Sequence, residues 1–346
     1  MVKIAIIGGG LAGCALAYIL RQLGEEPVAY EAGSALANGA SGNSSGLYNP
    51  RFSALRGPES DFYAAAYCQA LRSFRTLANI DWRPCGVLHL MDTEKKKIRL
   101  HRTVENWGWD SAHMRLVGAD EASRIAGVDL RYDALYLPEG GSISPQKLCA
   151  AYLRNVEYHL NAPLEKLDDI EADIKILACG QAALKFVPRL PIIPVRGQIT
   201  QVKATQISEN VKCNICYEGY FMPAMDGVHT LGATFQPGLD HSRILKQDDP
   251  ENIQKLADAI PGLEVGLEIV GQRASVRATS RNRFPIIGRV PGHDNVYVSV
   301  AHGSYGILSS LMGGHLLADM ILDRSRCLPA DVIAALSPQR FKEFAA

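Results

Sequence analysis

Apolar positions along the chain fall into two patterns, short continuous runs and longer segments with helical spacing. The continuous runs at residues 3–7, 27–30, 173–180 and 296–300 predict buried strands. An apolar segment at residues 14–20 directly follows the first run and predicts a helix. Strands that alternate with helices in this way are typical of an α/β protein.

Helical spacing is clear at residues 61–78, where Phe62, Ala66, Ala70 and Phe74 would share one buried face. Three further helices are predicted: a charged one at residues 93–107, one at residues 145–154 with a proline near its start, and one that follows a glycine-rich turn after residue 300 and runs to about residue 322. The last of these repeats the order of strand, glycine turn and helix found at the N-terminus.

Residues 192–235 are rich in β-formers and turn residues, which predicts a mostly antiparallel sheet. The strands of the α/β pattern lie on both sides of this segment. We therefore expect one domain assembled from separated segments, with a second domain inserted, and an overall class of α/β (α+β). The predicted first domain comprises residues 1–80, 140–190 and 275–346, and the inserted domain comprises residues 81–139 and 191–274.

The first strand and helix are joined by a G-x-G-x-x-G motif formed by Gly8, Gly10 and Gly13. The first glycine permits a tight turn, the second lets a pyrophosphate approach the backbone, and the third lets helix and strand pack closely. Glu31 ends the second strand, 18 residues after Gly13, where an acid can hydrogen-bond a ribose hydroxyl. This combination predicts dinucleotide binding; the alternative is an ordinary turn between strand and helix in a parallel sheet.

Composition narrows the class of protein. The 346 residues are 47% hydrophobic and 21% charged, with a net charge of zero, so a nucleic acid or an acidic membrane would have to be held by a local patch. No apolar run reaches the roughly 20 residues of a membrane helix, and the N-terminal strand leaves no room for a signal peptide. Eight scattered cysteines favour the reducing cytoplasm, and the single C-x-x-C at Cys213 and Cys216 is weak evidence for a metal site.

The glycine motif, Glu31, the strand ending at Gly180 and the closing strand–turn–helix resemble the FAD-dependent D-amino-acid oxidase superfamily over nearly the whole chain. The resemblance implies a Rossmann-like FAD-binding domain of the glutathione-reductase type with an inserted, mostly antiparallel substrate domain. Some members attach the flavin through a cysteine after the substrate arginine. Because residues 278–287 contain no cysteine, we expect non-covalent FAD.

A more specific resemblance is to one branch of this superfamily, the FAD domains of bifunctional tRNA 5-methylaminomethyl-2-thiouridine biosynthesis enzymes. It is carried by the loop at residues 38–50 and by residues 194–198, 216–224, 276–288 and 336–341. The resemblance implies oxidative removal of the carboxymethyl group from 5-carboxymethylaminomethyl-(2-thio)uridine at the tRNA wobble position, which gives glyoxylate and the 5-aminomethyl nucleoside. This chain has no methyltransferase domain ahead of the FAD domain, so we expect a free-standing oxidase, with a separate methyltransferase acting on its product.

The resemblance also implies the site residues. Arg277 occupies the place of the carboxylate-binding arginine of glycine-oxidase-like enzymes, with a surface arginine as the alternative. Tyr217 and Tyr220 would line the same cleft, or belong to the core. His302 is expected to be a hydrogen-bonding residue and not a base. The expected FAD contacts are Gly8, Gly10, Leu11, Ala12, Gly13, Glu31, Ser41, Gly42, Asn43, Gly46, Gly180, Gly303, Ser304, Tyr305, Gly306 and Ile307.

Two groups of basic residues are candidates for phosphate contacts, with solvated surface faces as the alternative. One group is Arg273, Arg277, Arg281, Arg283 and Arg289, followed later by Arg324, Arg326, Arg340 and Lys342; the other is Lys95, Lys96, Lys97, Arg99 and Arg102. Three functions stay open: a tRNA-modifying FAD oxidoreductase, a small-molecule oxidase or dehydrogenase of the glycine, sarcosine or D-amino-acid type, and a flavin-binding scaffold without activity.

Overall fold

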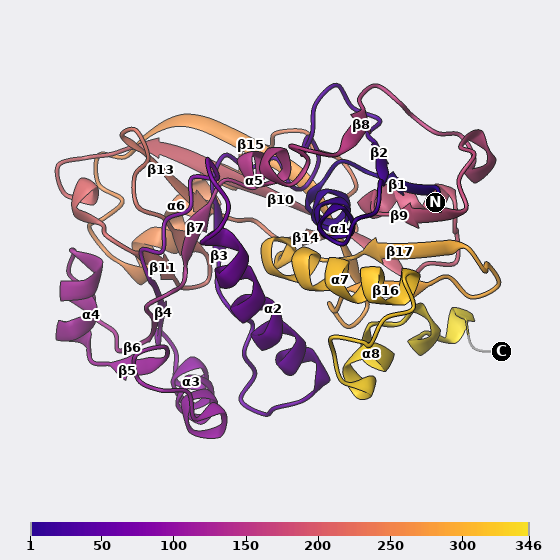
Figure 1. Ribbon diagram of the computed structural model, residues 1–346. Coiled ribbons are helices and arrows are strands. Elements are labelled where there is room, and N and C mark those ends of the chain that lie inside the picture. Colours follow the sequence, from indigo (N-terminus) through magenta and orange to yellow (C-terminus); the bar gives the residue numbers. More distant parts are fainter. Residues whose placement is uncertain (1, 345–346) are drawn as a thin grey trace.

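The computed structural model describes residues 2–344, and its N-terminal strand belongs to a six-stranded sheet (Figure 1). The strand order is β16-β17-β9-β1-β2-β8, and every pair is parallel except β16 with β17. The strands predicted from the four apolar runs are confirmed as members of this sheet. The six strands are β1 (Ile4–Ile7), β2 (Val28–Tyr30), β8 (Glu157–His159), β9 (Ile174–Leu177), β16 (Ile286–Arg289) and β17 (Val296–Val300).

Helices α1 and α7 pack against each other beside this sheet (Figure 1). A Cβ atom on Gly314 of α7 would lie 2.8 Å from the Ile19 side chain and 3.2 Å from the Leu16 backbone of α1, so the glycine permits this close approach. The helices of this region are α1 (Leu11–Gln22), α2 (Pro58–Phe74), α5 (Pro145–Tyr152), α7 (Gly306–Ile321) and α8 (Ala330–Leu336). Their apolar faces form one continuous core with β1 and β9.

The second large sheet is mostly antiparallel, as predicted, with one parallel pair between β11 and β4. Its strands are β4 (Val87–Leu90), β5 (Arg115–Val117), β6 (Ala134–Leu137), β10 (Ile192–Lys203), β11 (Asn214–Cys216), β12 (Tyr220–Phe221), β13 (Val228–Gly232), β14 (Gln236–Pro237) and β15 (Glu268–Ser280). Helices α3 (Glu94–Trp107), α4 (Ala119–Ala126) and α6 (Asp248–Ala259) accompany it. A small sheet of β3 (Gly46–Tyr48) and β7 (Gly141–Ile143) completes the strands.

Two helix boundaries show how local chemistry sets the ends. The helix predicted at residues 61–78 is α2, which begins earlier, at Pro58, and ends at Phe74. A proline at the first helical position costs no hydrogen bond, because the N–H that it lacks would have no partner in the helix. Helix α3 begins where the Thr93 hydroxyl accepts a hydrogen bond from the Lys96 N–H, and it ends at Gly108, which has a left-handed backbone conformation. These ends agree with the helix predicted at residues 93–107.

The sequence pattern did not predict β15. This thirteen-residue strand pairs with β10 along its length, with Arg277 opposite Val195. Its residues do not alternate cleanly between buried and exposed positions. The sequence therefore lacks the alternation of apolar and polar residues by which a half-buried strand is predicted. The predicted domain boundary between residues 274 and 275 falls within this strand.

Among the helices formed by residues 2–344, none has the length and hydrophobicity required to cross a lipid bilayer.

Candidate active site

A cavity of ≈ 1090 Å³ is lined by residues of both large sheets. Of the nineteen predicted FAD-contact and substrate residues, seventeen line it: Gly8, Gly10, Leu11, Ala12, Glu31, Ser41, Asn43, Gly46, Gly180, Tyr217, Tyr220, Arg277, Gly303, Ser304, Tyr305, Gly306 and Ile307. Gly13 and Gly42 do not line it. The chain segments that meet here come from all parts of the sequence, so the cavity exists only in the folded protein.

The glycine turn between β1 and α1 forms one wall of the cavity. Gly8 has a φ of 118°, and a Cβ atom on Gly13 would lie 2.0 Å from the Gly8 carbonyl oxygen, so both positions require glycine. Gly10 caps α1 without a side chain, and the Leu11 N–H donates to the Ser41 hydroxyl over 3.1 Å. The start of α1 thus presents backbone N–H groups to the cavity, an arrangement that favours a phosphate.

The Glu31 carboxylate is fixed at the cavity wall by two backbone N–H groups. One oxygen accepts from Gly9 and the other from Gly33, each over 2.7 Å. Each oxygen keeps a further lone pair for a ligand. The arrangement suits a carboxylate that receives hydroxyl donors, as the sequence predicted for a ribose.

Arg273 holds the loop that carries Ser41 and Asn43. Its guanidinium donates to the Asn43 side-chain oxygen over 2.9 Å and to the carbonyls of Asn38 and Gly39 over 3.3 and 2.5 Å. A Cβ atom on Gly42 would lie 2.3 Å from this guanidinium, so Gly42 permits its close approach. The side chain predicted as a phosphate contact is therefore engaged within the protein, where it orders the loop.

The second glycine turn, between β17 and α7, presents Gly303 with a φ of 58° and the start of α7 to the same cavity. The two ring nitrogens of His302 lie 3.0 Å from the Ser299 hydroxyl and 2.9 Å from the Ser309 hydroxyl. Desolvation lowers the pKa of His302 to about 4, so the ring is neutral near pH 7. Both nitrogens are occupied, which fits a hydrogen-bonding residue better than a base.

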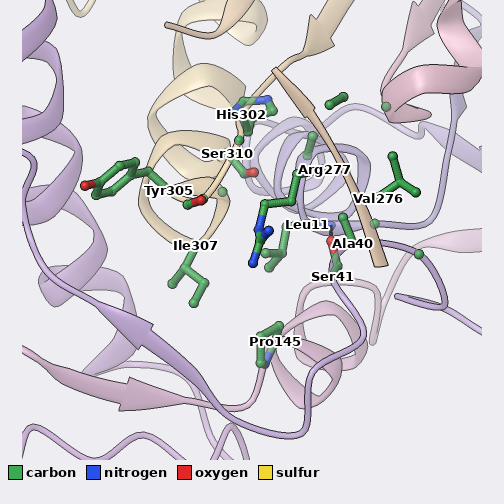
Figure 2. A pocket seen from close by; sticks show the side chains of 18 of the residues that line it. Leu11, Ala40, Ser41, Pro145, Val276, Arg277, His302, Tyr305, Ile307 and Ser310 are labelled. Carbon is green, nitrogen blue, oxygen red and sulfur yellow. Dashed lines mark hydrogen bonds between the residues drawn. The ribbon is translucent and has the colours of Figure 1, made fainter. Parts of the chain in front are cut away.

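Arg277 projects from β15 into the space bordered by Leu11, Ser41 and Ile307 (Figure 2). Its buried Nη1 has no hydrogen-bond partner among residues 2–344, and desolvation lowers the pKa of the guanidinium. Gly197 makes room for it, because a Cβ atom there would lie 1.9 Å from Nη1. An unpaired buried cation is costly, which points to an anionic ligand.

Tyr217 and Tyr220 both line the cavity, and Tyr217 also packs against the core of the second sheet. The Tyr217 hydroxyl donates to the Tyr220 carbonyl over 3.2 Å. Desolvation raises the pKa of both phenols, while the charge of Arg277 works in the opposite direction at Tyr220. Both hydroxyls therefore stay protonated at neutral pH. The Tyr217 proton is used in its bond to the Tyr220 carbonyl, and Tyr220 is the phenol that senses the charge of Arg277.

Residues Arg196 and Gln198, on either side of Gly197, point to the face of β10 opposite to Arg277. There they form a buried polar network. Arg196 is fully buried and donates to the Asp248 carboxylate over 2.5 Å and to the Gln198 side chain over 2.8 Å. Gln198 in turn donates to Asp249 of α6 over 3.2 Å. The network ties β10 to α6 and thereby fixes the strand against which the Arg277 guanidinium lies.

Sequence reasoning missed part of the cavity wall. His89 of β4 lines it beside Asn49, with 3.0 Å between the His89 Nε2 and the Asn49 amide nitrogen. Lys96 and Arg99 of α3 line it as well, and both belong to the charged helix that the sequence had singled out for phosphate contacts. Their spacing of three residues puts them on one helix face, but the charge run alone did not show that this face meets the cavity.

The basic group after residue 272 is largely occupied by partners within the protein. Arg281 pairs with Glu343, Arg289 lies 3.8 Å from Asp294, and Arg324 lies 3.5 Å from Asp319. Arg326 and Arg340 donate to backbone carbonyls. Of this group only Arg277 lines the cavity. The other lysine and arginine side chains on the described part of its wall are Lys96 and Arg99 of α3 and Lys185, which donates to the Leu164 carbonyl and pairs with Glu165.

The fold is that of a nucleotide-dependent oxidoreductase. Its marks are the two strand–glycine turn–helix units, the acid after β2 and the cavity that they share. A family comparison agrees with this class. Residues 3–320 match the family model described as "FAD dependent oxidoreductase" (DAO). The chain belongs to this family and depends on FAD. The glycine cradle and the unpaired Arg277 fit a large anionic cofactor next to an anionic substrate.

Two relatives carry the name "tRNA 5-methylaminomethyl-2-thiouridine biosynthesis bifunctional protein MnmC". That of Hahella chejuensis is 30% identical over 98% of this chain, and that of Chromobacterium violaceum is 29% identical over 97%. The chain spans 59% of the length of each. The solved structure of glycine oxidase from Geobacillus kaustophilus superimposes with a TM-score of 0.84 over 98% of this chain and 99% of that one, at 21% identity, and shows the same fold.

Proposed function

We propose that this protein oxidises the carboxymethylamine group of 5-carboxymethylaminomethyl-(2-thio)uridine at the tRNA wobble position, and releases glyoxylate and the 5-aminomethyl nucleoside. The observation that carries the proposal is Arg277, whose buried Nη1 has no hydrogen-bond partner among residues 2–344 and which lines the cavity that contains both glycine turns. The names of the relatives supply the tRNA part of the proposal.

In this proposal, FAD is held mainly by backbone groups. The N–H groups at the start of α1 would receive the pyrophosphate, and Glu31 would receive the ribose hydroxyls. The loop at residues 41–43 and Gly46 would lie along the cofactor, and the N–H groups of residues 303–307 would face the pyrimidine edge of the flavin. When bound, the flavin supplies the hydride acceptor.

We further propose that FAD is bound non-covalently. Cys179 and Cys216 line the cavity, and desolvation raises the pKa of each thiol to about 12. Both thiols therefore stay protonated at neutral pH, and a protonated thiol is a poor nucleophile. Acid precipitation should release all of the yellow colour into the supernatant; colour that stays with the precipitated protein would contradict this part.

The residues of the chain orient the substrate for the reaction. Arg277 would hold the carboxylate by two parallel hydrogen bonds, with Tyr220 as a neighbouring donor. This fixes the CH₂ between carboxylate and amine, from which a hydride leaves while the nitrogen lone pair forms a C=N bond. Water then adds to the imine carbon and the C–N bond breaks, so that glyoxylate and the primary amine separate. The neutral His302 supplies no charge that would compete for the carboxylate.

A tRNA substrate would place the reaction in the cytoplasm. The primary amine that it leaves is the group on which a methyltransferase acts in the two-step route implied by the resemblance, so we propose such an enzyme as the next to act on the product.

A second candidate function is oxidation of a small amino acid or amine. The specific observation in its favour is Arg277 itself, because glycine, sarcosine and D-alanine carry the same carboxylate. A scaffold without activity has no use for such a residue.

Product analysis separates these candidates. Purified yellow protein is mixed anaerobically with tRNA that carries 5-carboxymethylaminomethyluridine, and the digested nucleosides are analysed by mass spectrometry. We expect flavin bleaching and a shift to the 5-aminomethyl nucleoside. Bleaching by glycine, sarcosine or D-alanine and not by the tRNA would move the protein to the small-molecule class; no bleaching by any of them would support the scaffold.

A further inference from the structure

The cavity continues past Arg277 and Tyr220 to a second polar end that the reaction described above does not use. Pairing in the second sheet places Tyr220 opposite Cys216, and Cys216 opposite His89. Neighbouring strands lie about 4.8 Å apart, so His89 stands two strands, or about 10 Å, from Tyr220 on the same sheet. All three residues line the cavity.

Helix α3 places two cations at this end. Lys96 and Arg99 are three residues apart and line the cavity together, while Lys95 and Arg102 of the same helix are exposed and do not. Lys96 is held by Asp92 over 2.7 Å. Arg99 is exposed, and within residues 2–344 it makes no ion pair. Its guanidinium is therefore free to meet an anion.

The charges of Lys96 and Arg99 act on His89, which lines the same cavity. Its pKa is lowered to about 4, first by desolvation and then by the charges of Arg99 and Lys96. The ring is therefore neutral near pH 7. Its Nε2 faces the Asn49 amide nitrogen, which donates, so the ring proton lies on Nδ1. This end of the cavity thus combines two cations with a neutral donor. Two carboxylates lie near them: Asp92, which holds Lys96, and Glu218 of the turn between β11 and β12, which also lines the cavity.

The two ends of the cavity differ in what they can bind. A glycine-type substrate places its carboxylate on Arg277 and its amine next to the flavin, and no part of it extends another 10 Å. A modified nucleotide does extend that far, because its base, ribose and phosphate follow the amine. The phosphate groups are the anionic part of a nucleic acid, and arginine and lysine side chains commonly bind them.

We propose that Lys96 and Arg99 form a phosphate subsite, which binds the RNA backbone next to the nucleotide whose carboxymethylamine group reaches Arg277. The proposal rests on the proposed function, since it assumes a tRNA substrate. It assigns selection for RNA over small amino acids to α3 and not to the arginines after residue 272. It also predicts that phosphate binding and carboxylate binding are separable.

The experiment compares two double variants with the same change of charge on the same helix. Lys96→Ala/Arg99→Ala removes the cavity pair, and Lys95→Ala/Arg102→Ala removes two exposed cations of the same helix that do not line the cavity. Flavin reduction is followed anaerobically with two substrates, the modified tRNA and the free nucleoside 5-carboxymethylaminomethyluridine, which has no phosphate. Flavin absorbance and thermal melting show that each variant is folded and loaded.

For the cavity pair we expect the apparent Kd for tRNA to rise about 10-fold to 100-fold, with the rate at saturation nearly unchanged. The slope of log Kd against log salt concentration should fall by about 0.7 for each phosphate that no longer meets a cation. Oxidation of the nucleoside should not change. The control pair should alter tRNA binding less than threefold and leave nucleoside oxidation as in the wild type.

Equal effects of the two double variants on tRNA would overturn the subsite and leave the proposed function intact, as would an equal loss with tRNA and nucleoside. A wild-type protein that oxidises neither substrate would overturn both proposals. If the wild type oxidises the tRNA but not the nucleoside, a part of the RNA beyond the nucleoside is required, and the comparison of the double variants then decides whether α3 binds that part.

Discussion

In the proposed complex the cavity has a cofactor end, which contains both glycine turns, and a substrate end around Arg277 and Tyr220, and the two are built in different ways. At the cofactor end, the ligand-facing groups are backbone N–H groups and one carboxylate, supplied by short segments such as residues 8–13 and 303–307. The carboxylate is held within the protein, because Glu31 accepts from the N–H groups of Gly9 and Gly33. At the substrate end, the groups are single side chains from separate strands, and the buried Nη1 of Arg277 has no partner among residues 2–344.

This difference implies that the two ends fail differently when they are changed. The cofactor end is part of the packing between helix and strand, so its disruption should affect folding and FAD retention. The substrate end is a set of side chains on an intact sheet, so its disruption should affect catalysis and leave the fold in place. The following variants test that separation, from the largest expected effect to the smallest.

Replacement of Gly13 with alanine should have the largest effect. The new Cβ atom would lie 2.0 Å from the Gly8 carbonyl oxygen, a backbone atom that cannot move without opening the turn. We expect a loss of about 3 kcal/mol in the free energy of unfolding, together with loss of bound FAD. Thermal melting and the absorbance of the bound flavin measure both. Gly118→Ala is the control, since its Cβ atom would meet nothing closer than 3.8 Å; equal melting of the two variants would contradict the account.

Arg273 and Arg277 share one strand, yet they should belong to different ends. Arg273→Ala removes three hydrogen bonds to the loop at residues 38–43. We expect the Kd for FAD to rise about tenfold, with little change in the KM of the reconstituted enzyme at saturating FAD. Fluorescence titration of the apoprotein with FAD gives the Kd, and Arg289→Ala is the matched surface control. If the affinity for FAD is unchanged and the KM for tRNA is raised, Arg273 contacts an RNA phosphate, as the sequence alone suggested, and does not order the loop.

Gly197→Ala should sharpen the definition of the substrate end. The added methyl group would occupy the position of the Arg277 Nη1, and the end of an arginine side chain can move aside at little cost in stability. We expect a KM raised at least fivefold, unchanged FAD binding and a melting temperature within a few degrees of the wild type. Steady-state kinetics and thermal melting provide the test; a collapse of the melting temperature with normal KM would mean that Gly197 serves the packing of the sheet alone.

The pH dependence of stability should show the smallest effect. His302 has a pKa lowered from its ordinary 6.5 to about 4 in the folded protein, chiefly by desolvation. Between these values the unfolded chain binds the proton and the folded protein does not, so the free energy of unfolding falls as the pH drops from 6.5 toward 4. Urea unfolding of the holoprotein at several pH values should show a shallower fall for His302→Gln. The exposed His293→Gln should leave the slope unchanged, and a steeper slope for His302→Gln would contradict the assignment.

The parts of the protein that could be predicted from sequence are those encoded by neighbouring residues. The turn between β1 and α1 is specified by Gly8, Gly10 and Gly13, whatever packs around it. Likewise, Thr93 caps the helix that it directly precedes. The partner of Arg273 could not be found in this way, because Asn43 is 230 residues away and meets it only through the pairing of β15 with β10. The same holds for His89, whose position at the cavity depends on the strand order of the second sheet.

The central claim is that Arg277 binds a substrate carboxylate in the FAD cavity, and a comparison of two tRNAs tests it most directly. One carries 5-carboxymethylaminomethyluridine and the other 5-methylaminomethyluridine, which keeps an oxidisable carbon on the amine but lacks the carboxylate. Anaerobic stopped-flow absorbance should show flavin reduction with the first tRNA only, slowed about 100-fold or more in Arg277→Ala and partly restored in Arg277→Lys. Equal reduction by both tRNAs, or an Arg277→Ala variant as fast as the wild type, would contradict the account.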